Sequence, residues 1–167
     1  MVQLSPDNGL PGWDRISGYF YPDSTIAGFS HTHLSGTGAG DLYDISFMPV
    51  TLPYKEAEAP LGIHSRFSHD DESATAGYYQ VLLKDYNINV ELTATERCGI
   101  QRYTFPEAQA AIFLNLKKAM NWDFTNDSRI EIVDSVTIQG YRFSDGWARD
   151  QLSLIHISEP TRRTPIS

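Results

Sequence analysis

The sequence predicts an all-β fold, an antiparallel β-sandwich, on three observations. Short segments alternate apolar and polar residues with a period of two, they end at Gly, Asp or Pro, and turn-forming loops separate them. The clearest alternation is NINVELTA, residues 87–94, in which Ile88, Val90 and Leu92 alternate with polar side chains. Such a segment forms a strand that buries one face and leaves the other in solvent.

The first 40 residues are expected to form long loops between short strands. The segments PDNG, LPGWD, YPDST and SGTGAGD combine Gly, Pro, Asp, Asn and Ser, the residues that favour turns. The same loops have a high aromatic content. Rings on polar loops pack inward or stack on a ligand, and the sequence alone leaves both open. The aromatic residues in question are Trp13, Tyr19, Phe20, Tyr21 and Phe29.

Strands are expected to dominate the chain from residue 43 onward. In YDISFMPV, residues 43–50, the period of two places Tyr43, Ile45 and Phe47 on one side of a single strand. Each of the further strand-like segments is bounded by Gly, Asp or Pro. These segments are residues 77–84, 99–105, 129–139 and 141–143.

One segment, PEAQAAIFLNLKKAM over residues 106–120, is compatible with either a helix or a strand. Pro106 is suited to the first position of a helix, and Ala, Leu and Lys favour one. AIFLNL is, however, also typical of a buried strand. Because the segments on both sides are strand-like, we predict a strand here.

The last 16 residues do not continue this pattern and are expected to lie outside the fold. LSLIHISEPTR, residues 152–162, resembles the conceptual translation of a transposase adapter used in DNA library preparation. We therefore expect one domain over residues 1–151 and an adapter-derived or read-through tail over residues 152–167. The alternative is a native C-terminal strand formed by LSLIHI.

Composition and charge exclude several classes of function. The net charge is −8 and no basic cluster offsets it, so a nucleic-acid partner is not expected. No apolar run is long enough to span a bilayer. Cys98 is the only cysteine, which excludes an internal disulfide and a zinc–thiolate cluster. The N-terminus, MVQLSPDNGLPGWDR, shows no signal peptide.

Several segments together resemble the N-terminal β-sandwich domain of family 92 glycoside hydrolases, the calcium-dependent, inverting α-mannosidases. They are MVQLSPD, GWDRISGYFYPDSTIAGFSHTHLSGTGAGDLYDISFMPV, FSHDDESATAGYYQVLL, INVELTATERCGIQRYTFP and IQGYRFSDGWARDQ. The resemblance implies an incomplete sandwich of the supersandwich type, truncated at both ends. It also implies a secreted or periplasmic parent protein, whose signal peptide would lie upstream of Met1.

The resemblance further implies that the catalytic residues lie outside this chain. Inverting hydrolysis needs a carboxylic acid and a carboxylate base, and no spacing of acidic residues here singles out such a pair. The family places both on a helical (α/α) barrel domain, so we predict no catalytic residue in the chain. The expected partners are that barrel and a mannose-containing glycan. Calcium is the family's cofactor, but no complete calcium site is expected within these residues.

His31 and His33 are two residues apart, which on a strand would place both on one face. That spacing can supply half of a transition-metal site, with Asp41 and Asp44 as nearby candidates. Calcium prefers oxygen ligands, so the imidazoles are poor ligands for it. We favour an interpretation without metal, in which one histidine orders the loop and the other borders a sugar pocket.

Trp13 and Asp14, in the segment GWDR, are the strongest carbohydrate signal. Sugars stack their C–H faces on indole and pair their hydroxyls with carboxylates. We therefore predict that Trp13, Asp14, His31 and His33 bind substrate; the alternative for Trp13 is core or interdomain packing. Trp122 and Trp147 are expected to be structural. Gln101 stands where the family commonly has histidine, and Ala76 where proline is frequent.

No nucleotide site is expected at the segment SGTGAGD, because it lacks the preceding strand, the following helix and the Lys-Ser/Thr pair of a phosphate-binding loop. The leading hypothesis is thus a fragment of an α-mannosidase acting on N-glycans or related mannosides. An independent carbohydrate-binding module is the alternative. A small metalloenzyme that uses the two histidines is a third hypothesis.

Overall fold

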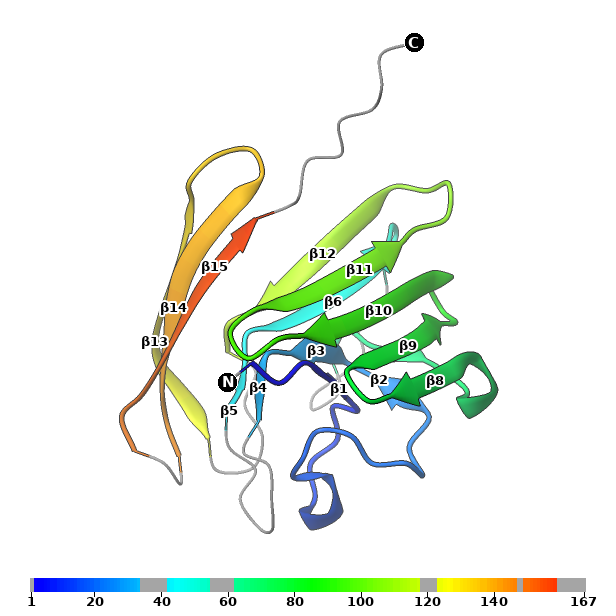
Figure 1. Ribbon diagram of the computed structural model, residues 1–167, viewed down its shortest axis with the longest axis horizontal. Helices are drawn as coiled ribbons and strands as arrows, with labels where there is room; N and C mark the ends of the chain where they lie inside the picture. Colours follow the sequence, from blue (N-terminus) through cyan, green and yellow to red (C-terminus); the bar gives the residue numbers. More distant parts are fainter. Residues whose placement is uncertain (1, 34–41, 55–61, 118–122, 147–148, 159–167) are drawn as a thin grey trace.

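The computed structural model describes residues 2–33, 42–54, 62–117, 123–146 and 149–158. Strands make up nearly all of the regular structure, and every strand pair is antiparallel (Figure 1). The only helical turns in these ranges are η1 (Trp13–Arg15) and η2 (His69–Asp71). The predicted all-β, antiparallel class is confirmed.

Two four-stranded sheets form the body of the fold, with strand orders β1-β3-β6-β12 and β11-β10-β9-β8. The first contains β1 (Ser5–Asp7), β3 (Gly28–Ser30), β6 (Ser46–Thr51) and β12 (Ala110–Asn115). The second contains β8 (Glu72–Thr75), β9 (Tyr78–Leu83), β10 (Ile88–Ala94) and β11 (Gly99–Thr104).

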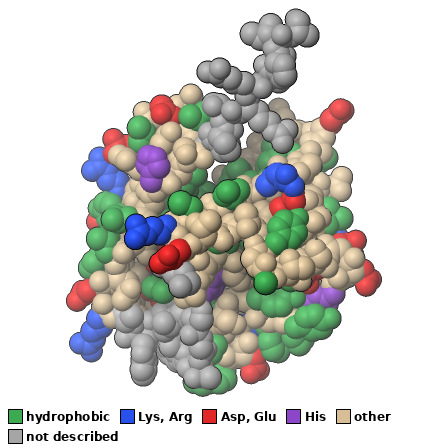
Figure 2. Space-filling model, viewed as in Figure 1, with side chains coloured by type: hydrophobic (Ala, Val, Ile, Leu, Met, Phe, Trp, Pro, Cys, Tyr) green, Lys and Arg blue, Asp and Glu red, His purple; other side chains and the backbone are tan. Residues whose placement is uncertain are grey.

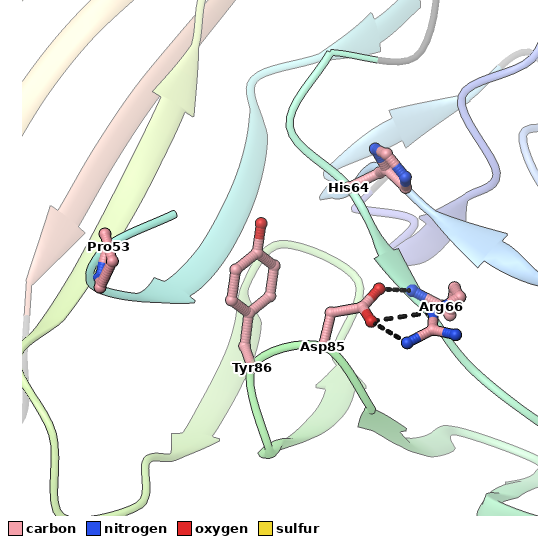
Figure 3. Close-up of a pocket in the computed structure, with 5 residues that line it drawn as sticks. All are labelled: Pro53, His64, Arg66, Asp85 and Tyr86. Carbon is pink, nitrogen blue, oxygen red and sulfur yellow. Dashed lines mark hydrogen bonds and ion pairs between the residues drawn. The ribbon is translucent and has the colours of Figure 1, made fainter. Parts of the chain in front are cut away.

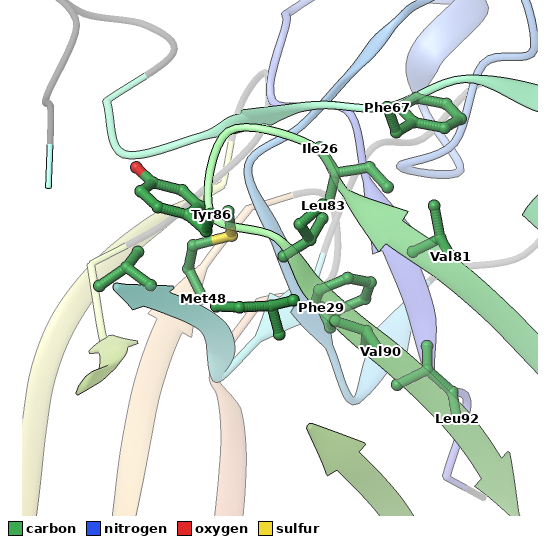
Figure 4. Close-up of a cluster of buried hydrophobic side chains, with 11 residues drawn as sticks. Ile26, Phe29, Met48, Phe67, Val81, Leu83, Tyr86, Val90 and Leu92 are labelled. Carbon is green, nitrogen blue, oxygen red and sulfur yellow. The ribbon is translucent and has the colours of Figure 1, made fainter. Parts of the chain in front are cut away.

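The hydrophobic core combines side chains from both sheets (Figure 4). On β10, Ile88 and Val90 are fully buried and Leu92 is 2% exposed, while the alternate residues are more exposed, as their period of two predicts. Burying such a side chain contributes about 1.5–3 kcal/mol. The buried cluster consists of Ile26, Phe29, Met48, Val50, Phe67, Val81, Leu83, Tyr86, Ile88, Val90 and Leu92.

The strand predicted within residues 106–120 is confirmed as β12, which pairs with β6 from Ala110 opposite Thr51 to Asn115 opposite Ser46. A strand lets Ala111 and Phe113 pack against the core from one face, and this packing outweighs the helical propensity of the segment.

The prediction of one regular strand over residues 43–50 is wrong. The segment divides into β5 (Leu42–Asp44) and β6, because Leu42, Tyr43 and Ile45 adopt positive φ angles of 80°, 53° and 60°. These angles interrupt the extended backbone on which a period of two depends. From Tyr43 to Val50 every residue is buried.

The remaining strands form three smaller units. No helix in the described part of the chain is long and apolar enough to cross a bilayer. One of the three units is a three-stranded sheet with the order β13-β14-β15. Its first two strands are β13 (Phe124–Ile132) and β14 (Thr137–Asp145). The two-stranded units are β2 (Thr25–Ile26) with β7 (Ser65–Arg66), and β4 (Thr32–His33) with β5.

The strand β15 (Gln151–Ser158) differs from the expectation that residues 152–167 lie outside the fold. It pairs with β14 along its whole length, and Ser153 Oγ donates a hydrogen bond to Asp44. The alternation in LSLIHI suits an edge strand whatever its source, which accounts for the pairing. The adapter origin of this segment stays a prediction.

Candidate functional site

Trp13 and Asp14 lie on η1, a single 3-10 turn in the N-terminal loop. Both side chains are exposed, and Trp13 keeps 66% of its surface accessible. A large indole on a polar loop that is not drawn into the core is available to stack on a ligand. The structure thus favours the exposed alternative for Trp13 over core packing.

Arg15 braces η1 against the loop that follows it. Its Nε and Nη2 each lie 2.6 Å from a carboxylate oxygen of Asp23, and its guanidinium carbon lies 4.7 Å from the ring centroid of Phe20. A two-point Arg–carboxylate pair restricts orientation as well as distance. Trp13 and Asp14 are therefore carried on a turn whose position is well restrained.

His33 is a buried, fully engaged side chain. Its Nε2 lies 2.9 Å from Asp7 Oδ1 and 2.8 Å from Ser30 Oγ, and its Nδ1 lies 3.2 Å from the backbone oxygen of Gln3. Its ring lies edge-on to that of Tyr43, with the two ring centroids 5.1 Å apart. With 7% exposure and both nitrogens occupied, His33 joins β1, β3 and β4 and offers no free atom to a ligand.

The Ser30, His33 and Asp7 side chains resemble a catalytic triad in composition but not in geometry. In a triad the carboxylate holds one imidazole nitrogen and the hydroxyl faces the other. Here both Ser30 and Asp7 contact the same nitrogen, Nε2. All three side chains are also buried, so a substrate cannot reach the hydroxyl. This cluster is structural.

His31 is held in a different environment. Its Nδ1 lies 2.9 Å from the backbone oxygen of Ile45, which can only accept, so Nδ1 carries the proton. Its Nε2 then accepts from Gln101 Nε2 at 3.1 Å. Burial lowers the pKa of His31, which favours this neutral form. The Phe47 ring lies edge-on to the imidazole of His31, with the two ring centroids 5.1 Å apart.

The two histidines do not form half of a metal site. His31 contacts β11 and the backbone before β6, whereas His33 contacts β1 and β3. Within the described ranges no group of three or more His, Cys, Asp or Glu side chains is placed to hold a metal ion. The condition for placing both imidazoles on one strand face is not met, because His31 lies between β3, which ends at Ser30, and β4, which begins at Thr32.

Residues 42–45, which we call the strap, contact both η1 and the two histidines. A positive φ at a bulky residue costs about 1–3 kcal/mol and persists only where the surroundings enforce it. Tyr43 Oη donates to the backbone oxygens of Arg15 and Ile16, and is 3.1 Å from the first. His31 bonds the oxygen of Ile45. The strap therefore ties η1 to both histidines.

Arg142 on β14 holds the other side of the strap. It is fully buried and pairs with Asp44 and, at 2.8 Å, with Asp123. Its Nη1 also donates to the backbone oxygen of Leu42 at 3.2 Å. Burial lowers the pKa of Arg142 to about 10, which still leaves the guanidinium charged at neutral pH.

Sequence reasoning did not identify Arg142 and Tyr43 as residues that shape this region. A charged residue in the middle of the strand-like YRF is a signal for a buried ion pair, and it points to Arg142. Tyr43 carries no comparable signal. The glycine-rich residues 34–41, including Asp41, and both Trp122 and Trp147 lie outside the described residues.

A separate cavity of about 360 Å³ does not include the predicted site residues (Figure 3). Arg66 and Asp85 form a two-point ion pair in it, with Arg66 Nη2 2.6 Å and Nε 2.9 Å from Asp85 Oδ1. This pairing lowers the pKa of Asp85, so the carboxylate is a poor proton acceptor. The lining residues are Pro53, His64, Arg66, Asp85 and Tyr86.

Comparisons with known proteins place these features in a family. A family model described as the glycosyl hydrolase family 92 N-terminal domain matches residues 1–162. A comparison with curated proteins returned no match.

Among solved structures, the family GH92 α-mannosidase BT3965 from Bacteroides thetaiotaomicron is similar to this chain. In complex with mannoimidazole it aligns with a TM-score of 0.84 and 38% identity over 90% of the chain. The inverting mannosidase BT2199 from the same organism aligns with a TM-score of 0.65 and 20% identity, which shows a shared fold. The chain covers 20% of the first structure and 24% of the second, so it spans about a fifth to a quarter of their length.

Proposed function

The chain belongs to the N-terminal domain family of glycoside hydrolase family 92, and we propose that it forms part of the mannose-binding pocket of a longer α-mannosidase. One observation carries this proposal: the 38% identity to an α-mannosidase over 90% of the chain. The substrate class we infer is the N-glycans or related mannosides. A secreted or periplasmic location for the complete protein would bring it to such glycans.

In this proposal each predicted residue has a role that follows from its position. Trp13 stacks on the C–H face of a mannose ring, and Asp14 accepts hydrogen bonds from its hydroxyls. His31 borders the pocket as a neutral imidazole. His33, whose nitrogens are both engaged, orders the backbone that carries the pocket wall.

The chemical step is assigned to a domain beyond these residues. Inverting hydrolysis requires an acid to protonate the leaving oxygen and a base, about 6.5–9.5 Å away, to activate a water. We propose that both lie on a helical barrel, and that this chain binds and orients the sugar. The proposal assigns calcium to no residue of this chain.

Replacing Trp13 tests the proposal in a longer protein that contains this domain and its helical partner. We expect Trp13→Ala to lower kcat/KM for an α-mannoside at least tenfold, which corresponds to a loss of about 1.4 kcal/mol of transition-state stabilisation. Tyr54→Ala, which removes another exposed aromatic ring, is the control and should change kcat/KM little.

Two results would contradict the proposal. One is an unchanged kcat/KM for Trp13→Ala in the longer protein. The other is mannosidase turnover by the 167-residue chain itself, because that would place an acid and a base within these residues.

A further inference from the structure

Tyr21 is an exposed aromatic ring whose position is restrained by a stack. It retains 66% of its accessible surface and lies in a turn closed by the hydrogen bond from Asp23 N–H to the oxygen of Phe20, 3.0 Å long. One face of its ring stacks on the imidazole of His69, with centroids 4.0 Å apart and planes 8° from parallel. The high exposure leaves the rest of the ring open to solvent.

His69 is anchored at both nitrogens. Its Nε2 donates to the backbone oxygen of Tyr21 at 2.7 Å, and its Nδ1 lies 2.6 Å from Glu72 Oε2. The same Glu72 oxygen accepts from Tyr19 Oη at 3.0 Å. The hydrogen bond with Glu72 raises the pKa of His69, which favours an imidazolium that donates from both nitrogens.

The stack continues into the core. Phe67, which is 4% exposed, lies edge-on to the His69 ring with the ring centroids 5.2 Å apart. Its centroid is 6.5 Å from that of Tyr19. A surface ring normally loses side-chain freedom when it binds a ligand, at about 0.5–1.5 kcal/mol for each immobilised side chain. Because the stack on His69 already restricts the Tyr21 side chain, most of this loss of side-chain freedom has occurred in the free protein before a ligand binds.

The surroundings of the ring favour a neutral, hydroxyl-rich ligand. Asp70 and Asp71 follow His69 and are exposed, and the charge of Asp70 acts on the His69 imidazole. Asp71 is paired with Lys84 at 3.1 Å. Carboxylates accept hydrogen bonds from hydroxyls and repel anions. A neutral sugar can therefore stack on the ring and donate hydrogen bonds to the carboxylates beside it.

We propose that Tyr21, stacked on His69, is a sugar-binding position additional to Trp13, and that it takes one pyranose ring of a mannose-containing glycan. This inference rests on the proposed function for the class of ligand. Tyr21 holds a sugar by stacking, and the exposed carboxylate of Asp70, next to His69 in the chain, accepts hydrogen bonds from its hydroxyls.

The test uses the 167-residue chain at low micromolar concentration, titrated with mannotriose and followed by ligand-observed NMR. We expect millimolar binding that Tyr21→Ala weakens at least fivefold and Tyr21→Phe, which keeps the ring, weakens less than twofold. His69→Ala should weaken it because the ring loses its support. Tyr54→Ala, which removes an exposed aromatic ring that has no assigned role in binding, should leave the affinity for mannotriose unchanged.

Three results would overturn the inference: no binding by the wild-type chain, equal binding by Tyr21→Ala, or a preference for tetramethylammonium over mannotriose. The last would identify the stack as a cation site. Failure here is distinct from failure of the proposed function, which is measured through Trp13 and turnover in the longer protein. Melting curves confirm that each variant is folded.

Discussion

At the scale of single residues, close packing decides which side chains the polar cluster beneath η1 tolerates. Gly18 has a φ of 86°, and a Cβ placed there would lie 2.5 Å from Asp7 Oδ1, 3.0 Å from Tyr43 Cε1 and 3.1 Å from His33 Nε2. All three neighbours are buried and engaged, so none can retreat without breaking a contact. A glycine is required for both its backbone angle and its size.

Gly18→Ala is therefore expected to destabilise the chain by about 2–4 kcal/mol, which combines a left-handed backbone cost of about 1 kcal/mol with an overpacking cost of about 1–3 kcal/mol. Chemical denaturation measures this difference. Gly77→Ala is the control, because Gly77 has a similar φ of 80° but no atom within 4 Å of the added Cβ. Equal losses for the two variants would show that the collision is unimportant.

At the scale of elements, buried charge connects the three-stranded sheet to the strap. Arg142 on β14 reaches Asp44 on β5, 98 residues away in the chain, and Asp123 just before β13. Removing one partner of a buried ion pair leaves an unpaired charge in a low-dielectric environment. When one partner of an exposed pair is removed, water solvates the charge that remains, so the loss of stability is small. The two situations predict different responses to the same substitution.

We expect Arg142→Ala to lower the free energy of unfolding by about 3–5 kcal/mol. Arg66→Ala removes an ion pair of comparable geometry with Asp85, but the Arg66 side chain is 73% exposed, so the variant should unfold at nearly the wild-type denaturant concentration. Urea titrations of the two variants make the comparison. Similar losses for both would contradict a dominant role for burial.

At the scale of the whole molecule, the surface combines a net charge of −8 with exposed apolar side chains. On the face shown in Figure 2, Lys and Arg side chains are scattered and form no basic patch. The three-stranded sheet exposes Ile132, Leu152 and Leu154 at 76%, 57% and 74%. Apolar side chains on an edge strand promote association between chains.

The chain alone is accordingly expected to self-associate as its concentration rises, as measured by size-exclusion chromatography with light scattering. Replacing Leu152 and Leu154 by Lys should shift it towards monomer, since both side chains project from the same face of β15. Lys at Gln139 and Ser158 is the control, because it adds the same charge to exposed positions without removing apolar surface. A wild-type chain that stays monomeric at every concentration would contradict this expectation.

The sequence by itself determined the all-β class, the strand β10 and the turn-rich loop that carries Trp13, whose 66% exposure only the structure shows. These depend on local properties: a period of two, turn residues, and an indole flanked by Gly and Asp. Only the tertiary structure decided that His33 is buried while His31 bonds Gln101, that β5 and β6 are separated by left-handed residues, and that Arg142 secures the strap. Each of these depends on partners distant in the chain, such as Asp7 for His33 and Asp44 for Arg142, which no local pattern encodes.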